Sequence, residues 1–225
     1  MSTEELQQIP VENEPSSFRL IITLGIAGFL SGCILVGIYI FTKPIIAKNK
    51  AEALKAAIFE VLPNTSGFKM LEADGTSLKE LPDGTETTAE VIYMGLNESG
   101  EITGFAVPGE EPGYADIIAA LAGYNPGKKT VIGFKVLESK ETPGLGDKIF
   151  KNEEFQTNFI ALEVEPDIEF VKNGERTSAN QVEGITGATI SSTAVTRLLS
   201  KTFKKWKDPI EEFMATTDLK LANHE

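Results

Sequence analysis

The longest apolar run of the sequence lies near its start, from Leu20 to Thr42, and contains no charged residue. A helix of this length measures about 34 Å at about 1.5 Å per residue, which is enough to cross a hydrocarbon core of about 30 Å. Arg19 and Lys43 flank the run. The pattern therefore predicts a transmembrane helix over residues 20–42, preceded by a tail over residues 1–19.

Three other interpretations of this run remain open. It could be a buried helix of a soluble protein, although such length without a charge is rare there. It could be a cleaved signal peptide, but the leader MSTEELQQIPVENEPSS is acidic, whereas signal peptides have basic leaders. The letters LSGC at 30–33 resemble a lipoprotein processing site, yet the apolar run continues directly after Cys33. A retained membrane helix is favoured.

The segment from residue 43 to residue 62 predicts a second, amphipathic helix that continues the first one outward. Pro44 suits its entry or a kink, and Pro63 ends it. Its apolar positions recur near helical spacing: Ile46, Leu54, Ile58 and Val61.

Residues 63–225 alternate short strand-like runs with turns, which predicts a separate domain. The runs VIYMGL and EITGFAV flank the turn NESG, and DIIAALAGY and KTVIGFKVLE flank NPGK, so two hairpins are expected. KNGE at 172–175 marks another turn, and a helix is expected around 152–159. A last long helix is expected from Thr189, with one apolar face: Val195, Leu198, Leu199, Thr202 and Trp206. The fold class is therefore α+β, with antiparallel hairpins packed against helices.

Composition excludes most enzyme classes. Acidic residues outnumber basic ones by 33 to 21, for a net charge of −12, so nucleic acid is not an expected partner. The chain has one cysteine and one histidine, and His224 is the penultimate residue. An internal disulfide, a histidine-dependent catalytic triad, a zinc site and an iron–sulfur cluster all lack their side chains. We therefore predict neither a catalytic residue nor a metal site.

Two glycine-rich motifs stand out, and the first is ETPGLGDKI at 141–149. Gly144 and Gly146 would let backbone amides approach a ligand closely, while Lys148 could neutralise a phosphate or a carbonyl and Glu141 could accept hydrogen bonds. The motif is neither a Walker loop nor a dinucleotide fingerprint. A plain Gly/Pro turn is the alternative.

The second motif, TGAT at 186–189, directly precedes the last helix. A helix N-terminus presents free N–H groups and a partial positive charge, which suit a phosphate. The simpler alternative is that Thr189 or Ser191 only caps the helix. No base lies nearby in the sequence to activate a hydroxyl group as a nucleophile.

TGAT resembles the flavinylation motif of the FMN-binding domains in the Rnf and Na⁺-translocating NADH:quinone reductase complexes. KETPGLGDKI resembles the second signature of that family, and Gly113–Tyr114 fits its pattern. In this family a flavin transferase moves FMN from FAD onto the threonine that ends [Ser/Thr]-Gly-Ala-Thr, as a phosphoester. The family usually has Asp three residues before the first Ser/Thr, where this chain has Glu183.

The resemblance implies FMN attached covalently to Thr189 and a cofactor site built from both motifs. The expected site residues besides Thr189 are Thr186, Gly187, Ala188, Ser191, Ser192, Glu141, Thr142, Gly144, Leu145, Gly146 and Lys148. The flavin would carry the electrons, so the protein itself would need no acid or base.

The resemblance further implies a single-span component of an ion-translocating ferredoxin:NAD⁺ oxidoreductase in a bacterial or archaeal membrane. The tail over 1–19 would be cytoplasmic and the domain over 63–225 extracytoplasmic, although the lysines after the apolar run favour the opposite orientation. The expected partners are other membrane subunits, including flavin- and iron–sulfur-containing ones, and the flavin transferase. The alternatives are the quinone-reductase branch of the family and a membrane-anchored ligand-binding module without covalent flavin.

Overall fold

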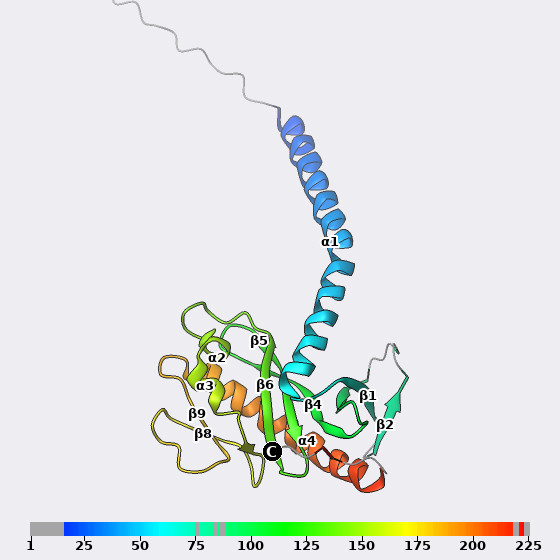
Figure 1. Ribbon diagram of the computed structural model, residues 1–225. Helices are drawn as coiled ribbons and strands as arrows, with labels where there is room; N and C mark the ends of the chain where they lie inside the picture. Colours follow the sequence, from blue (N-terminus) through cyan, green and yellow to red (C-terminus); the bar gives the residue numbers. More distant parts are fainter. Residues whose placement is uncertain (1–15, 75–76, 83–84, 86–88, 218–220, 223–225) are drawn as a thin grey trace, which may run out of the picture. The chain divides into compact units, whose positions relative to one another are not determined.

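The computed structural model describes residues 16–74, 77–82, 85, 89–217 and 221–222. Most of the predicted tail and His224 lie outside the described residues. Figure 1 shows the elements in chain order. They are α1 (Ser17–Val61), β1 (Gly67–Asp74), β2 (Ser77–Leu81), β3 (Val91–Leu96), β4 (Ile102–Pro112), β5 (Ile117–Asn125), β6 (Thr130–Glu138), α2 (Lys148–Lys151), α3 (Glu153–Thr157), β7 (Leu162–Glu163), β8 (Glu169–Val171), β9 (Gln181–Glu183) and α4 (Thr189–Thr216).

Helix α1 joins the two predicted N-terminal helices into one, and Pro44 lies inside it. In the described part of the chain it is the one helix long and apolar enough to cross a membrane. The side chains of residues 18–41 are exposed, which contradicts the interpretation as a buried helix of a soluble protein. The chain divides into two compact units between Ala51 and Glu52.

The second unit is built on a seven-stranded sheet with the strand order β2-β1-β3-β4-β5-β6-β7. Every pairing in it is antiparallel, and the two predicted hairpins are confirmed as β3–β4 and β5–β6. The hairpin of β1 and β2 was not predicted. The turn expected at 172–175 is present, but the strands on either side of it, β8 and β9, pair in parallel.

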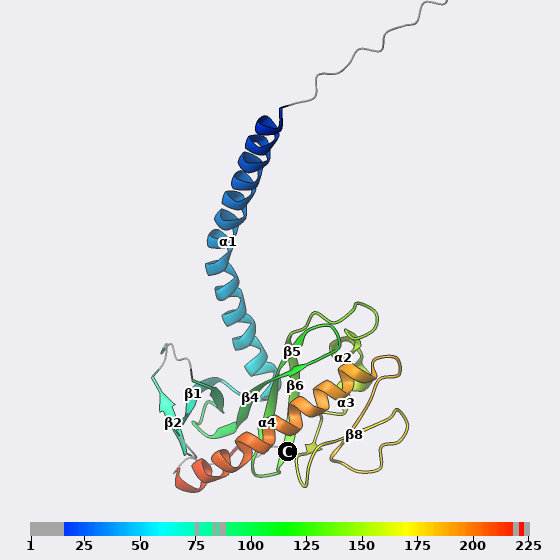
Figure 2. The same cartoon turned by 180° about the vertical axis from the view of Figure 1, so that it is seen from behind.

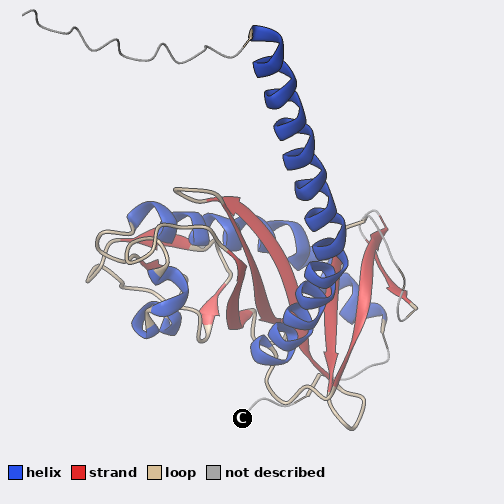
Figure 3. Cartoon of the chain, turned by 90° about the horizontal axis from the view of Figure 1, so that it is seen from above, coloured by secondary structure: helices blue, strands red, loops and turns tan. Residues whose placement is uncertain are grey.

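The two faces of the sheet are covered by different helices. Side chains alternate between the faces along a strand, so neighbouring residues of β4 pack against different helices. Phe105 and Val107 of β4 belong to the main core, which includes α4. Ala106 packs instead with Ile58 and Val61 from the end of α1. Figure 2 shows α4 lying across its face of the sheet, and Figure 3 shows the strands from above.

The end of α1 packs so closely on β5 that a side chain would not fit between them. A Cβ atom on Gly123 would lie 2.1 Å from the carbonyl oxygen of Val61. The apolar face predicted for residues 43–62 is correct at this end only, since Ile58 and Val61 are buried but Ile46 is exposed.

The predicted apolar face of α4 is confirmed, because its members are buried: Val195, Leu198, Leu199, Thr202 and Trp206. The short helix expected around 152–159 is α3, capped by Asn152, whose Oδ1 accepts the Phe155 N–H at 2.7 Å. The α+β class with antiparallel hairpins is therefore confirmed.

Candidate functional site

Three segments that are far apart in the sequence meet beside the start of α4. They are the turn after β4, the ETPGLG segment after β6 and the TGAT segment. Together they line a depression with a volume of about 320 Å³. Its lining consists of Tyr114, Glu141, Thr142, Leu145, Gly146, Gly187, Ala188, Thr189, Ile190 and Ser191. We refer to this depression as the candidate site.

The carboxylate of Glu141 links these three segments. Its Oε1 accepts the backbone N–H groups of Tyr114 at 2.8 Å and Ala115 at 2.9 Å. Its Oε2 accepts the hydroxyl group of Ser191 at 2.5 Å. Glu141 is buried, so these three donors provide the hydrogen bonds that a carboxylate removed from water requires. Glu141 thus accepts hydrogen bonds within the chain, and its expected role toward a ligand stays a prediction.

Two glycines allow the neighbouring loops to lie against this carboxylate. A Cβ atom on Gly113 would lie 2.4 Å from Oε1 of Glu141, and one on Gly146 would lie 2.3 Å from Oε2. Both distances are far below van der Waals contact. The close approach thus explains the glycine at 113 and the second glycine of ETPGLG.

Thr189 is the first residue of α4, and its side chain is exposed. Its hydroxyl group has no hydrogen-bond partner among the described residues. The N-cap position belongs to Ala188, and no side chain caps the helix there, so the proposed capping by Thr189 or Ser191 is wrong. Ser191 instead donates to Glu141. The N–H groups of the first turn therefore remain oriented outward beside Thr189.

Four predicted site residues do not line the depression: Thr186, Gly144, Lys148 and Ser192. Thr186 is exposed in the adjoining turn, and Lys148 begins α2. Ser192 is buried, where its Oγ donates to the Ala188 carbonyl at 2.9 Å and accepts the Ile185 N–H at 3.1 Å. These two hydrogen bonds join both ends of the turn that leads into α4.

The expectation that the Gly144 amide serves a ligand is wrong for this arrangement. Gly144 adopts a φ of +79°, and its N–H donates to Oδ1 of Asp147 at 2.7 Å. Oδ2 of the same carboxylate accepts from Lys151 Nζ at 2.6 Å. The hydrogen bond from Lys151, together with that from Gly144, holds the pKa of Asp147 below its ordinary value. Gly144 and Asp147 therefore shape the loop.

Two lining residues were not predicted from the sequence. Ile190 follows the TGAT motif, and Tyr114 was noted only for its place in a family pattern. Both side chains are exposed, as is that of Leu145. The Gly113–Tyr114 pair was the signal for Tyr114, whereas an isolated apolar residue at a helix start, such as Ile190, has no distinctive pattern.

Comparison with known proteins identifies the domain that contains this site. The family model of the FMN-binding domain matches residues 113–204, which contain both glycine-rich motifs. The chain is 33% identical over 177 residues to the G subunit of the ion-translocating oxidoreductase complex of Methanosarcina acetivorans, covering 79% of this chain and 87% of the relative. It is 28% identical to the G subunit of the Na⁺-translocating ferredoxin:NAD⁺ oxidoreductase complex of Acetobacterium woodii, over 80% of this chain and 86% of the relative.

The fold also has a counterpart among solved structures. The crystal structure of Shewanella oneidensis NqrC superimposes with a TM-score of 0.63 at 16% identity, covering 76% of this chain and 100% of that chain. This likeness concerns the fold alone. The sequence relatives decide between the two branches, and the chain belongs to the family of G subunits of ion-translocating oxidoreductase complexes.

Proposed function

We propose that this chain carries FMN, bound through a phosphoester to Thr189, and relays electrons within a membrane-bound ferredoxin:NAD⁺ oxidoreductase that moves ions. The observation that carries the proposal is the position of the Thr189 hydroxyl. It is exposed and unpaired among the described residues, and it lies at the rim of a depression lined by both glycine-rich motifs. The oxidoreductase activity belongs to the assembled complex.

The candidate site fits the two chemically different parts of FMN. A phosphodiester keeps one negative charge, which suits the partial positive charge, on the order of +0.5, at the N-terminus of α4. The exposed apolar side chains of Tyr114, Leu145 and Ile190 can contact a flat aromatic ring. A volume of about 320 Å³ is within the range of about 300–1,000 Å³ found for small-molecule sites.

Bound FMN supplies the electron-transfer chemistry, and the residues of the chain hold it in place. Gly187, with a φ of +83° and no atom near its missing Cβ position, leaves space next to Thr189 for attachment. Glu141 and Ser191 hold the walls of the depression together. No side chain of this chain needs to transfer a proton in this role.

The remaining assignments rest on the family. The apolar part of α1 would anchor the chain as a single span over 20–42, with the tail over 1–19 in the cytoplasm and the FMN-carrying unit on the opposite side. The other membrane subunits of the complex, including flavin- and iron–sulfur-containing ones, would exchange electrons with it. A flavin transferase would attach the FMN. Family membership favours this orientation over the one given by the lysine count.

Mass spectrometry of the full chain, produced with its flavin transferase, tests the proposal. We expect an increase equal to one FMN less one water, located on the peptide that contains Thr189, and a fluorescent band after denaturing electrophoresis. Thr189→Ala should abolish both signals. Thr216→Ala is the matched control, because Thr216 is exposed in the last turn of α4 and lies outside the TGAT motif.

An unmodified Thr189 in a complex that turns over normally would overturn the covalent attachment. If FMN then bound without a covalent bond, the chain would be the ligand-binding module considered as the alternative.

A further inference from the structure

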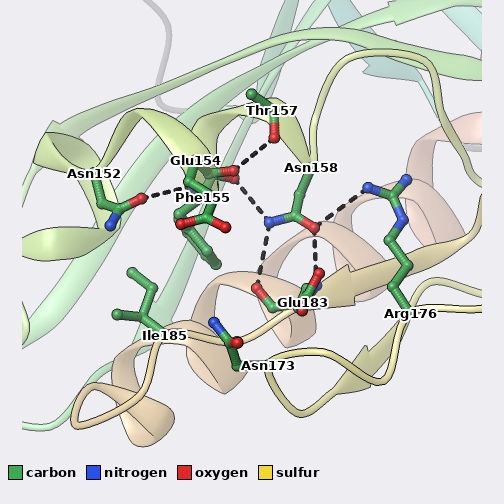
Figure 4. Close-up of a pocket in the computed structure, with 10 residues that line it drawn as sticks. Asn152, Glu154, Phe155, Thr157, Asn158, Asn173, Arg176, Glu183 and Ile185 are labelled. Atoms are coloured by element: carbon green, nitrogen blue, oxygen red, sulfur yellow. Dashed lines mark hydrogen bonds between the residues drawn. The ribbon is translucent and has the colours of Figure 1, made fainter.

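A second, polar pocket lies beside the segment that leads into the TGAT turn (Figure 4). It has a volume of about 180 Å³. Its lining consists of Asn152, Glu154, Phe155, Thr157, Asn158, Asn173, Arg176, Glu183, Gly184 and Ile185. None of these residues lines the candidate site, yet the chain passes from Ile185 directly into Thr186 and the acceptor threonine. We refer to residues 186–189 as the acceptor turn.

The buried side chain of Asn158 holds the backbone just before the acceptor turn. Its Oδ1 accepts the N–H of Glu183 at 2.9 Å, and its Nδ2 donates to the carbonyl of Glu183 at 3.2 Å. Nδ2 also donates to the carbonyl of Phe155 at 3.0 Å. The amide therefore satisfies both backbone groups of Glu183, as a neighbouring strand would. It joins α3 to the end of β9.

The next two residues are held as well. The Gly184 N–H donates to the carbonyl of Val171 at 2.9 Å, and the Phe170 ring lies so close that a Cβ atom on Gly184 would be 2.5 Å from it. The Ile185 N–H donates to Ser192 Oγ at 3.1 Å.

The carboxylate of Glu183 has a partner of its own, since it accepts the N–H of Gly174. This acid, at the position where related motifs carry Asp, therefore belongs to the scaffold that supports the turn. The segment 183–185 is held on several sides, whereas Thr186, Gly187 and Thr189 are exposed. Only residues 186–188 thus separate a fixed support from the first turn of α4.

We infer that Asn158 is a positioning residue for the attachment of FMN to Thr189. The inference rests on the proposed function. In the attachment step, Thr189 Oγ1 forms a bond to the FMN phosphorus of FAD, and the phosphoanhydride bond to AMP breaks. AMP leaves, the hydroxyl proton passes to solvent by way of the transferase, and nothing is oxidised or reduced. Asn158 contacts none of the reacting atoms.

Asn158 acts by favouring one conformation of the acceptor turn. Without its amide, the N–H and the carbonyl of Glu183 lose their partner, and the start of the turn can adopt other conformations. A transferase that binds only the competent conformation then acts on a smaller fraction of the chains. The KM for the acceptor protein rises as this fraction falls. The kcat stays the same, because at saturating acceptor protein every transferase molecule has bound a chain in the competent conformation.

The test is a time course of modification of the full chain in detergent, with purified transferase and FAD, followed by intact mass. Asn158→Ala should raise the KM about tenfold, the shift expected from losing about one net hydrogen bond, with kcat unchanged. Asn152→Ala is the matched control. It removes another amide that lines the same pocket and caps α3, but Asn152 makes no hydrogen bond to 183–189. It should retain the KM of the unsubstituted chain.

Asn158→Asp provides a second variant in case Asn158→Ala does not fold, as judged by Trp206 fluorescence. Aspartate keeps the acceptor for the Glu183 N–H and loses the donor to its carbonyl, so its KM should also rise. An unchanged KM in the folded Asn158 variants, or an equal rise in Asn152→Ala, would overturn the inference. If the unsubstituted chain gains no FMN mass, the proposed function fails instead, and the two failures are thereby distinguished.

Discussion

The carboxylate of Glu141 gives the most demanding test of how the candidate site is held together. Replacing Glu141 with Ala removes the acceptor of three hydrogen bonds, from the Tyr114 N–H, the Ala115 N–H and the Ser191 hydroxyl. Hydrogen bonds to a charged group contribute about 1.5–3 kcal/mol each, so the three together would contribute about 4.5–9 kcal/mol if water replaced none of them. The depression is open to solvent, and water can replace part of this contribution.

We therefore expect Glu141→Ala to lower the free energy of unfolding by about 3 kcal/mol. Glu141→Gln should lower it by about 1–2 kcal/mol, because the amide oxygen still accepts one set of donors but carries no charge. The difference between the two variants then reports how much of the effect depends on charge.

Urea unfolding of the full chain in detergent measures both values. Trp206 is the only tryptophan of the chain and is buried on α4, so its fluorescence follows the unit that contains the site. A matched control is Glu98→Ala, which removes an exposed carboxylate from the turn between β3 and β4 and should change the free energy by less than about 0.5 kcal/mol. If Glu141→Ala unfolds at the same urea concentration as Glu98→Ala, the three hydrogen bonds do not hold the site together.

Two further predictions concern packing and pH. Gly123→Ala should lower the melting temperature by about 5 °C, since its Cβ would lie 2.1 Å from the Val61 carbonyl oxygen, whereas Gly67→Ala has open space and should leave the temperature unchanged. Equal melting temperatures would refute this packing argument. Asp147→Asn should lower the free energy of unfolding at neutral pH. The pKa of Asp147 is lowered in the folded state, so the charged carboxylate stabilises the fold, and this difference between the variants should disappear as the pH falls below about 4. Urea titrations at several pH values check this, and a loss that is independent of pH would contradict it.

Local patterns in the sequence were sufficient for the elements that depend on neighbouring residues. The hairpins β3–β4 and β5–β6 were predicted from their turns, and α4 from its apolar face. The uncharged run that became the first half of α1 was equally clear. In each case residues within a few positions of one another determine the element, through turn geometry or helical spacing.

Elements that depend on distant partners were missed or misjudged. Strands β8 and β9 are three residues long each and pair in parallel, so a turn signal between them suggests the wrong arrangement. Ile46 has the spacing of a buried residue and is exposed, whereas Ile58 and Val61 of the same helix are buried in the second unit. Spacing alone does not say where the partner surface begins.

The candidate site shows the same division. Composition argued against most classes of catalytic and metal site, and the two glycine-rich motifs indicated two of the segments that line the candidate site. Only the tertiary structure decided the role of each residue. Glu141 and Ser191 are 50 positions apart and share a hydrogen bond, and Asn158 pairs with Glu183 across 25 positions. Such contacts arise when β6, α3 and β9 pack around the start of α4, and no local pattern encodes that packing.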